Sequence, residues 1–144
     1  MIAVETNLLV YAHREESPFH IRARDSLIRI AEGPDLWAIP WPCLHEFLAI
    51  VTHPKIFRRP TTMPHAWEFL DAVLESPPLR LLSETHSYQL TLRKLLGASR
   101  VVGPKVHDAR IAALCLDNAV GVLWTADRDF SRFPTLRTFN PLVA

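Results

Sequence analysis

The sequence predicts an α/β fold, a three-layer α/β/α sandwich around a central, mostly parallel sheet. Short, continuously apolar runs recur along the chain, and such runs are typical of strands that are covered on both faces of a parallel sheet. Longer segments with helical spacing of apolar residues separate these runs, and this alternation indicates strand–helix–strand units. A chain of 144 residues, 49% of them hydrophobic, is long enough for one core and too apolar for disorder. We therefore expect a single domain over residues 1–144.

The predicted strands are four compact apolar runs and a weaker fifth. They are Met1–Val4, Leu36–Ile39, Leu79–Leu82, Val120–Trp124 and, weakest, Leu136–Phe139.

The predicted helices begin and end near residues that favour helix termini. They are Phe19–Ala31, Cys43–Thr52, Pro64–Leu74, Tyr88–Leu96 and Lys105–Asn118. Ser17 and Pro18 fit the N-cap and first position of the first of these helices, and Gly97 fits the end of the fourth. The stretch Lys55–Thr62 lies between two helical segments and carries three basic residues, which predicts an exposed basic loop.

Composition and charge exclude several classes of protein. Sixteen basic residues against fifteen acidic ones leave a net charge of +1, which excludes a strongly basic nucleic-acid wrapper but not a nucleic-acid enzyme. Cys43 and Cys115 form no Cys-x-x-Cys pair, and the chain begins without a signal peptide or an apolar run of membrane-spanning length. These features predict a cytoplasmic protein without a membrane segment.

Acidic residues occur where the predicted fold brings distant segments together. Glu5 follows the first strand, whereas Asp127 and Asp129 follow the fourth. Glu46 and Asp108 interrupt apolar helical segments, where an acid is costly to bury unless it is paired or bound to a metal. Because open α/β sheets bind ligands at the carboxyl ends of their strands, we expect one acidic pocket at this edge.

A pocket lined by several carboxylates favours the binding of a divalent cation. Carboxylates a few ångströms apart raise one another's pKa unless a cation neutralises them. All-oxygen ligands suit Mg²⁺ or Mn²⁺, and an ion of this kind supports hydrolysis of a phosphodiester by water. The alternative for each acid taken singly is a turn residue, a helix cap or the partner of an arginine.

Four sequence blocks resemble the PIN-domain family. They are IAVETNLLVYA, WPCLHEFLAIV, HDARIAALCLDN and GVLWTADRDFSRFP. They occur in the family's order over essentially the whole chain, which is most similar to the VapC-type toxins of bacterial toxin–antitoxin pairs. The first block resembles a family pattern of a strand, an acidic turn and a short helix.

This resemblance implies a Mg²⁺- or Mn²⁺-dependent endoribonuclease with a PIN-like fold. By residue, it implies that Glu5, Glu46, Asp108 and Asp127 form the catalytic and metal-binding site, with Asp129 as a peripheral or alternative metal ligand. Supporting hydroxyl and amide groups would come from Thr6, Asn7 and Thr125.

Position 5 departs from the family pattern, which has Asp there. Glutamate retains the charge but adds a methylene group, and Mg²⁺ requires near-ideal octahedral geometry. Since a misplacement of about 1 Å can cost on the order of 10²-fold in rate, we expect a site that still attracts a metal but is catalytically weakened. A natural variant and an introduced change both fit the sequence.

The resemblance also implies partners. RNA would need basic residues near the pocket, and the candidates are Arg58, Arg59, Arg100, Lys105, Arg128 and Arg132, with a solvated surface as the alternative for each. An antitoxin would occupy a groove beside Phe19–Ala31 and Cys43–Val51, with Trp37, Trp41 and Trp67 as anchors. A homodimer is expected by the same analogy.

Two other functions remain as alternatives. The first is a catalytically inactive PIN-like module that binds RNA or an antitoxin. The second is a protein that uses an aspartate as a phosphoryl acceptor, which is disfavoured because position 5 is Glu and no lysine follows a predicted strand.

Overall fold

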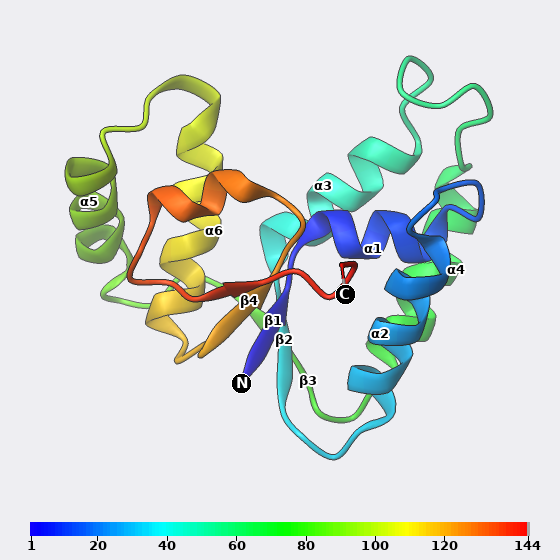
Figure 1. Cartoon of the computed structure of the whole chain (residues 1–144), viewed down its shortest axis with the longest axis horizontal. Coiled ribbons are helices and arrows are strands. Elements are labelled where there is room, and N and C mark those ends of the chain that lie inside the picture. Colours follow the sequence, from blue (N-terminus) through cyan, green and yellow to red (C-terminus); the bar gives the residue numbers. More distant parts are fainter. Residues whose placement is uncertain (144) are drawn as a thin grey trace.

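The computed structural model describes residues 1–143 as a five-stranded parallel sheet flanked by helices (Figure 1). The strands are β1 (Ile2–Val4), β2 (Trp37–Pro40), β3 (Leu79–Leu82), β4 (Val122–Trp124) and β5 (Thr138–Phe139). Their order in the sheet is β3-β2-β1-β4-β5, and every neighbouring pair is parallel. The predicted α/β sandwich is confirmed.

Helices cover both faces of this sheet. They are α1 (Thr6–His13), α2 (His20–Glu32), α3 (Trp41–Val51), α4 (Met63–Leu74), α5 (Tyr88–Ser99) and α6 (Val106–Asp117), with 3₁₀ turns η1 (Gly103–Lys105) and η2 (Arg128–Arg132). In Figure 1, α1, α2 and α4 lie to one side of the sheet, whereas α5 and α6 lie to the other. The central strands β1 and β4 therefore lie between two helical layers.

The burial of the sheet explains why its strands are apolar without alternation. Ala3 in β1, all of β2, and Leu123 in β4 are buried, because helices pack on both faces. The edge strand β5 differs, since Thr138 and Phe139 are both exposed. That exposure accounts for the weak signal of the fifth predicted strand.

Several predicted boundaries differ from the structure, and three of them illustrate local effects. Helix α5 continues past Gly97 to Ser99, and its C-cap Arg100 takes the left-handed conformation with φ 59°. Helix α3 begins at Trp41, because Pro42 in the first turn loses no helical hydrogen bond. Ser17 is not the N-cap of α2, although its Oγ accepts a hydrogen bond from the Phe19 N–H at 3.1 Å.

Helix α1 follows β1 directly and has no amphipathic stripe. Leu8, Leu9, Val10 and Ala12 are all buried, so the usual alternation of apolar and polar faces is missing. The resemblance implied a short helix here, whereas the periodicity of the residues did not mark one. Its N-cap is Glu5, whose carboxylate accepts from the Asn7 N–H.

Cys43 and Cys115 are buried free thiols, as expected. Within residues 1–143, no helix combines the length and apolar character required to cross a bilayer.

Candidate metal centre

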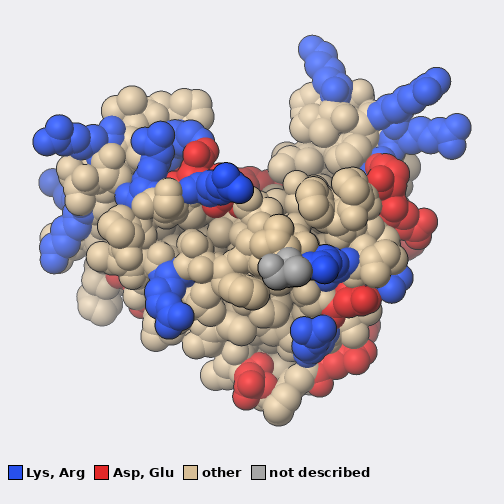
Figure 2. All heavy atoms as spheres, viewed as in Figure 1, with Lys and Arg blue, Asp and Glu red and all other residues tan. Residues whose placement is uncertain are grey.

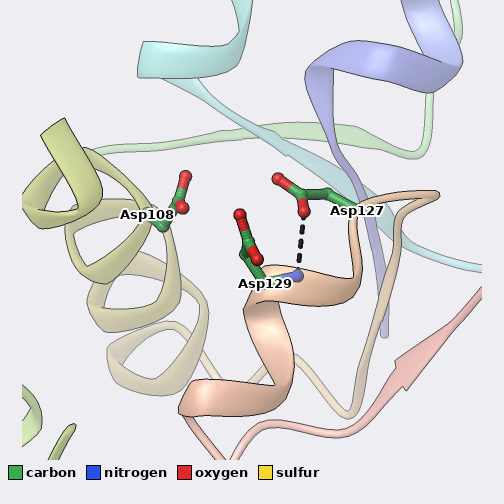
Figure 3. A group of neighbouring side chains, drawn as sticks. All are labelled: Asp108, Asp127 and Asp129. Carbon is green, nitrogen blue, oxygen red and sulfur yellow. Dashed lines mark hydrogen bonds between the residues drawn. The ribbon is translucent and has the colours of Figure 1, made fainter.

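Three aspartates meet at the carboxyl edge of the sheet (Figure 3). Asp108 comes from the first turn of α6, and Asp127 and Asp129 come from the segment that follows β4. One carboxylate oxygen from each lies within 4.8 Å of the other two, and all three residues are partly buried. We call these three residues the aspartate trio.

Backbone geometry after β4 orients two members of the trio. Asp127 is the N-cap of η2, and its Oδ1 accepts from the Asp129 N–H at 2.8 Å (Figure 3). The Asp127 N–H in turn donates to Thr125 Oγ1 at 3.0 Å. The Thr-x-Asp-x-Asp spacing therefore creates successive side-chain caps that hold the carboxylates at the end of the strand.

A lysine contacts the trio. Lys105, at the end of η1, forms an ion pair with Asp129 and lies 4.0 Å from the Asp108 carboxylate. The sequence suggested Lys105 only as an RNA contact. The signal for its contact with Asp108 was the three-residue spacing at a helix start, whereas nothing in the sequence indicated its contact with Asp129.

Glu5 and Glu46 lie beside the trio but outside the 4.8 Å group. Thr6 Oγ1 donates to the Glu46 carboxylate at 2.8 Å, and Thr125 Oγ1 donates to the Glu5 carboxylate at 3.3 Å. We call Glu5 and Glu46 the glutamate pair. Unlike the trio, this pair is held by hydroxyl groups.

Asn7 connects the ends of the two central strands. Its side-chain amide donates to Thr125 Oγ1 at 3.4 Å, and its Oδ1 accepts from the Ala126 N–H at 3.2 Å. All three residues suggested as supporting groups thus make hydrogen bonds within the site.

Burial and repulsion shift the acidity of two carboxyl groups. Burial raises the pKa of Glu5 to about 7, with further repulsion from Glu46 and Asp127, while hydrogen bonds from Asn7 and Thr125 oppose the shift. Burial, followed by the charge of Asp127, also raises the pKa of Asp108, and Lys105 opposes this. The trio and the pair therefore interact electrostatically across the site.

The donor set fits a hard divalent cation. Three aspartate carboxylates offer oxygen ligands at mutual distances below 4.8 Å, and Mg²⁺ and Mn²⁺ prefer such ligands. Burial and the charge of Asp127 raise the pKa of Asp108, and a cation at the trio would favour the ionised carboxylate.

The proposed RNA-contact residues Arg58, Arg59 and Arg128 lie in two separate segments of the chain. Arg58 and Arg59 are exposed in the loop between α3 and α4, and the Arg59 carbonyl accepts from Arg14 at 3.0 Å. Arg128 is exposed, and no ion pair within residues 1–143 engages it.

Of the two expected walls of the antitoxin groove, only α2 lines the large groove that the structure shows. The large groove of the molecule runs between α2, α4 and the loop before α4, and no residue of α3 lines it. Trp37 is wrong as an anchor, because it is 0% exposed and donates from Nε1 to Ser76 Oγ within the core. Trp41 and Trp67 are exposed.

Residues 2–136 match the PIN domain. The chain belongs to the PIN-domain family. It is 34% identical over 142 residues to the VapC ribonuclease Mb2897 of Mycobacterium bovis, covering 99% of this chain and 96% of that protein. This similarity identifies the chain as a VapC-type PIN nuclease.

Two solved structures share the fold of this PIN-domain protein. One is Mycobacterium tuberculosis VapC20, described as a sarcin–ricin loop cleaving toxin, with a TM-score of 0.66, 18% identity, and coverage of 91% of this chain and 93% of the other. The second is a toxin–antitoxin complex from Klebsiella pneumoniae, with a TM-score of 0.66, 15% identity, and 98% coverage of both chains.

Proposed function

We propose that this protein is a Mg²⁺- or Mn²⁺-dependent endoribonuclease that acts as the toxin of a toxin–antitoxin pair. The observation that carries the proposal is the aspartate trio, whose oxygen atoms gather within 4.8 Å at the carboxyl edge of the sheet. Ligand sites of open α/β folds occur at this edge, and its carboxylates match the requirements of a hard cation.

The trio would hold the cation, with Glu5 and Glu46 beside it. A bound ion of this kind lowers the pKa of a water molecule and stabilises negative charge on a phosphate. The chain's own hydrogen bonds do the positioning, since Thr125 and the Asp129 N–H restrain the carboxyl groups of Glu5 and Asp127. Lys105 supplies positive charge to Asp108 and Asp129.

Basic groups on either side of the site suit an RNA backbone. Figure 2 shows a hollow between two prominences, with acidic atoms near it and Lys and Arg side chains on both sides. One prominence is the loop between α3 and α4 (Figure 1), which carries Lys55, Arg58 and Arg59. We propose that Arg58 and Arg59 contact RNA from this loop and Arg128 from the edge of the trio.

The relatives support a protein partner as well. The complex from Klebsiella pneumoniae pairs a toxin with an antitoxin, and the groove between α2 and α4 is our proposed position for the antitoxin of this chain. We also propose a homodimer and a cytoplasmic site of action.

Cleavage of a panel of RNAs tests the nuclease activity. Transfer RNA, messenger RNA and an RNA that contains the sarcin–ricin loop should each be incubated with the protein in EDTA, Mg²⁺ and Mn²⁺. We expect metal-dependent cleavage of at least one of them, and far slower cleavage by Asp108→Asn. Cleavage that persists in EDTA would refute the proposed metal centre.

The second candidate function is a PIN-like module that binds RNA or an antitoxin without cleaving. Glu5 favours it, because the longer side chain alters the geometry of an otherwise fitting site. RNA binding without cleavage in any metal would establish this alternative.

A further inference from the structure

A second, smaller pocket lies next to the metal centre. It has a volume of about 300 Å³ and lies between α3, which contributes Pro42, His45 and Glu46, and α6, which contributes His107 and Arg110. Glu46 borders this pocket and belongs to the glutamate pair, and His107 directly precedes Asp108 in the sequence. An occupant of the pocket would therefore lie beside a group bound at the trio.

The pocket walls differ from the metal centre in their chemistry. Two histidines and one arginine line the pocket, and Glu46 is its one acid. Flat rings and guanidinium planes are the surfaces on which nucleobases stack. Among residues 1–143, the aspartate trio is the only group of three side chains whose ligand atoms cluster. The trio does not line this pocket, so the pocket is not a second metal site.

An exposed tryptophan extends the aromatic surface along α3. Trp41 is 39% exposed, and its ring centroid lies 6.0 Å from that of His45 with an interplanar angle of 33°. Because the two residues are four positions apart in one helix, they lie on the same face. This partly exposed aromatic surface therefore continues from the pocket wall at His45 along α3.

Arg110 is available for a ligand. It lies 3.8 Å from the Glu84 carboxylate, and both side chains are substantially exposed. An exposed pair at this distance contributes little to stability, so its guanidinium can exchange partners at small cost. A phosphate would offer it a stronger, charge-assisted hydrogen bond.

We propose that this pocket is a nucleobase subsite, which binds the base next to the phosphodiester held at the metal centre. His45 and His107 stack on the base, Trp41 extends the stacking surface, and Arg110 contacts the adjoining phosphate. The proposal rests on the endoribonuclease function and adds to it the residues that would bind the base.

Binding of two matched probes tests the subsite without cleavage. One probe is a fluorescein-labelled single-stranded pentaribonucleotide, and the other is an abasic pentaribose phosphate of the same charge. Fluorescence anisotropy is measured on the whole protein in Ca²⁺, which neutralises the carboxylates. We expect the wild type to bind the base-bearing probe about tenfold more tightly, as expected for one stacked base.

Variants of the pocket residues should separate stacking from charge. A His45→Ala/His107→Ala double variant should lose the preference for the base-bearing probe. Arg110→Ala should instead weaken the binding of both probes equally and reduce the salt dependence of their affinity. The matched controls are His65→Ala, since His65 is exposed on α4, and Arg137→Ala, since Arg137 lies at the opposite end of the sheet before β5. Both controls should behave as wild type.

The outcomes distinguish the subsite from the nuclease function. A wild type without base preference, or a double variant that retains it, would overturn the subsite, even if RNA cleavage in Mn²⁺ is robust. Absence of cleavage in every metal would refute the nuclease function, while the binding measurement would still test the pocket. An unchanged Ca²⁺-induced shift in melting temperature in the double variant would show that the acidic centre is intact.

Discussion

The aspartate trio and the glutamate pair differ in the groups that offset the repulsion between their carboxylates. The trio is partly exposed and has an ammonium group, that of Lys105, in contact with two of its members. The glutamate pair has no ion pair within residues 1–143 and accepts hydrogen bonds from the hydroxyl groups of Thr6 and Thr125 and from the Asn7 N–H. Glu5 is 6% exposed, so burial raises the pKa of its carboxyl group to about 7.

Because of this difference, we expect the trio to bind the cation directly and Glu5 to respond to it through its protonation. A lysine side chain is mobile and well hydrated, so the trio can exchange its ammonium for a divalent ion. Glu5 cannot exchange partners in the same way, because its contacts are hydrogen bonds within the fold. A cation near Asp127 would instead act on Glu5 through the charge of that neighbour, and would favour loss of the Glu5 proton.

Asp108→Asn should have the largest effect, since it removes the negative charge of one of the three clustered carboxylates. We expect metal-dependent RNA cleavage to fall by on the order of 10³-fold, together with loss of the Mn²⁺-induced rise in melting temperature. The matched control is Asp25→Asn on α2, whose partner is the exposed Arg24. A full Mn²⁺ shift in Asp108→Asn would contradict the role of the trio.

Glu5→Asp should have the next largest effect, in the opposite direction. Shortening the side chain by one methylene should increase the rate of RNA cleavage by up to about 10²-fold, because catalysis is sensitive to displacements of about 1 Å. Glu46→Asp should reduce the rate instead, since it would break the 2.8 Å hydrogen bond from Thr6. Equal cleavage rates for the wild type and the Glu5→Asp variant would exclude the weakened site.

Lys105→Met should make the trio bind metal more tightly. Without the ammonium, Asp108 and Asp129 lose their local positive charge, and we expect the Kd for Mn²⁺ to fall by about fivefold, the scale of one exposed ion pair. Isothermal titration calorimetry measures the change, with Lys94→Met on the exposed side of α5 as the control. A weaker Mn²⁺ affinity would show that Lys105 orders the trio rather than competing with the cation.

The sequence predicted that the acids lie at the carboxyl edge of the sheet, but it did not predict which of them come within metal-ligand distance of one another. Continuous apolar strands indicated the layers, and the carboxyl ends of β1 and β4 necessarily meet at one edge. Which acids come within ligand distance depends on side-chain directions, so the separation of Glu5 and Glu46 from the trio could not be read from spacing. The contact of Lys105 with Asp129 joins residues 24 positions apart, and no local pattern marks it.

Helix boundaries were likewise only partly predictable from local sequence patterns. Gly97 is a common helix terminator, yet α5 continues to Ser99 and turns at Arg100. The spacing of apolar residues did not predict helix α1, because its buried residues are distributed around the helix axis. Such a helix has no polar face opposite an apolar one.

The smallest predicted effect concerns the protonation of Glu5 in the metal-free protein. The pKa of Glu5 is raised from 4.5 to about 7 in the folded protein, so the folded state binds more protons than the unfolded state between these values. The free energy of unfolding therefore falls as the pH rises through this range. Between pH 6.5 and pH 8.5 the contribution of Glu5 is a loss of about 1 kcal/mol.

Glu5→Gln should remove this contribution, because a neutral amide does not titrate. Urea unfolding in EDTA at pH 6.5 and pH 8.5 should show a smaller loss of stability in the variant than in wild type. This pH window also limits interference from His13, whose pKa is lowered by burial and whose destabilising effect develops below pH 6.5. An identical pH dependence in both proteins would mean that Glu5 is ionised throughout, and the contrast between the pair and the trio would then lie in hydrogen bonding alone.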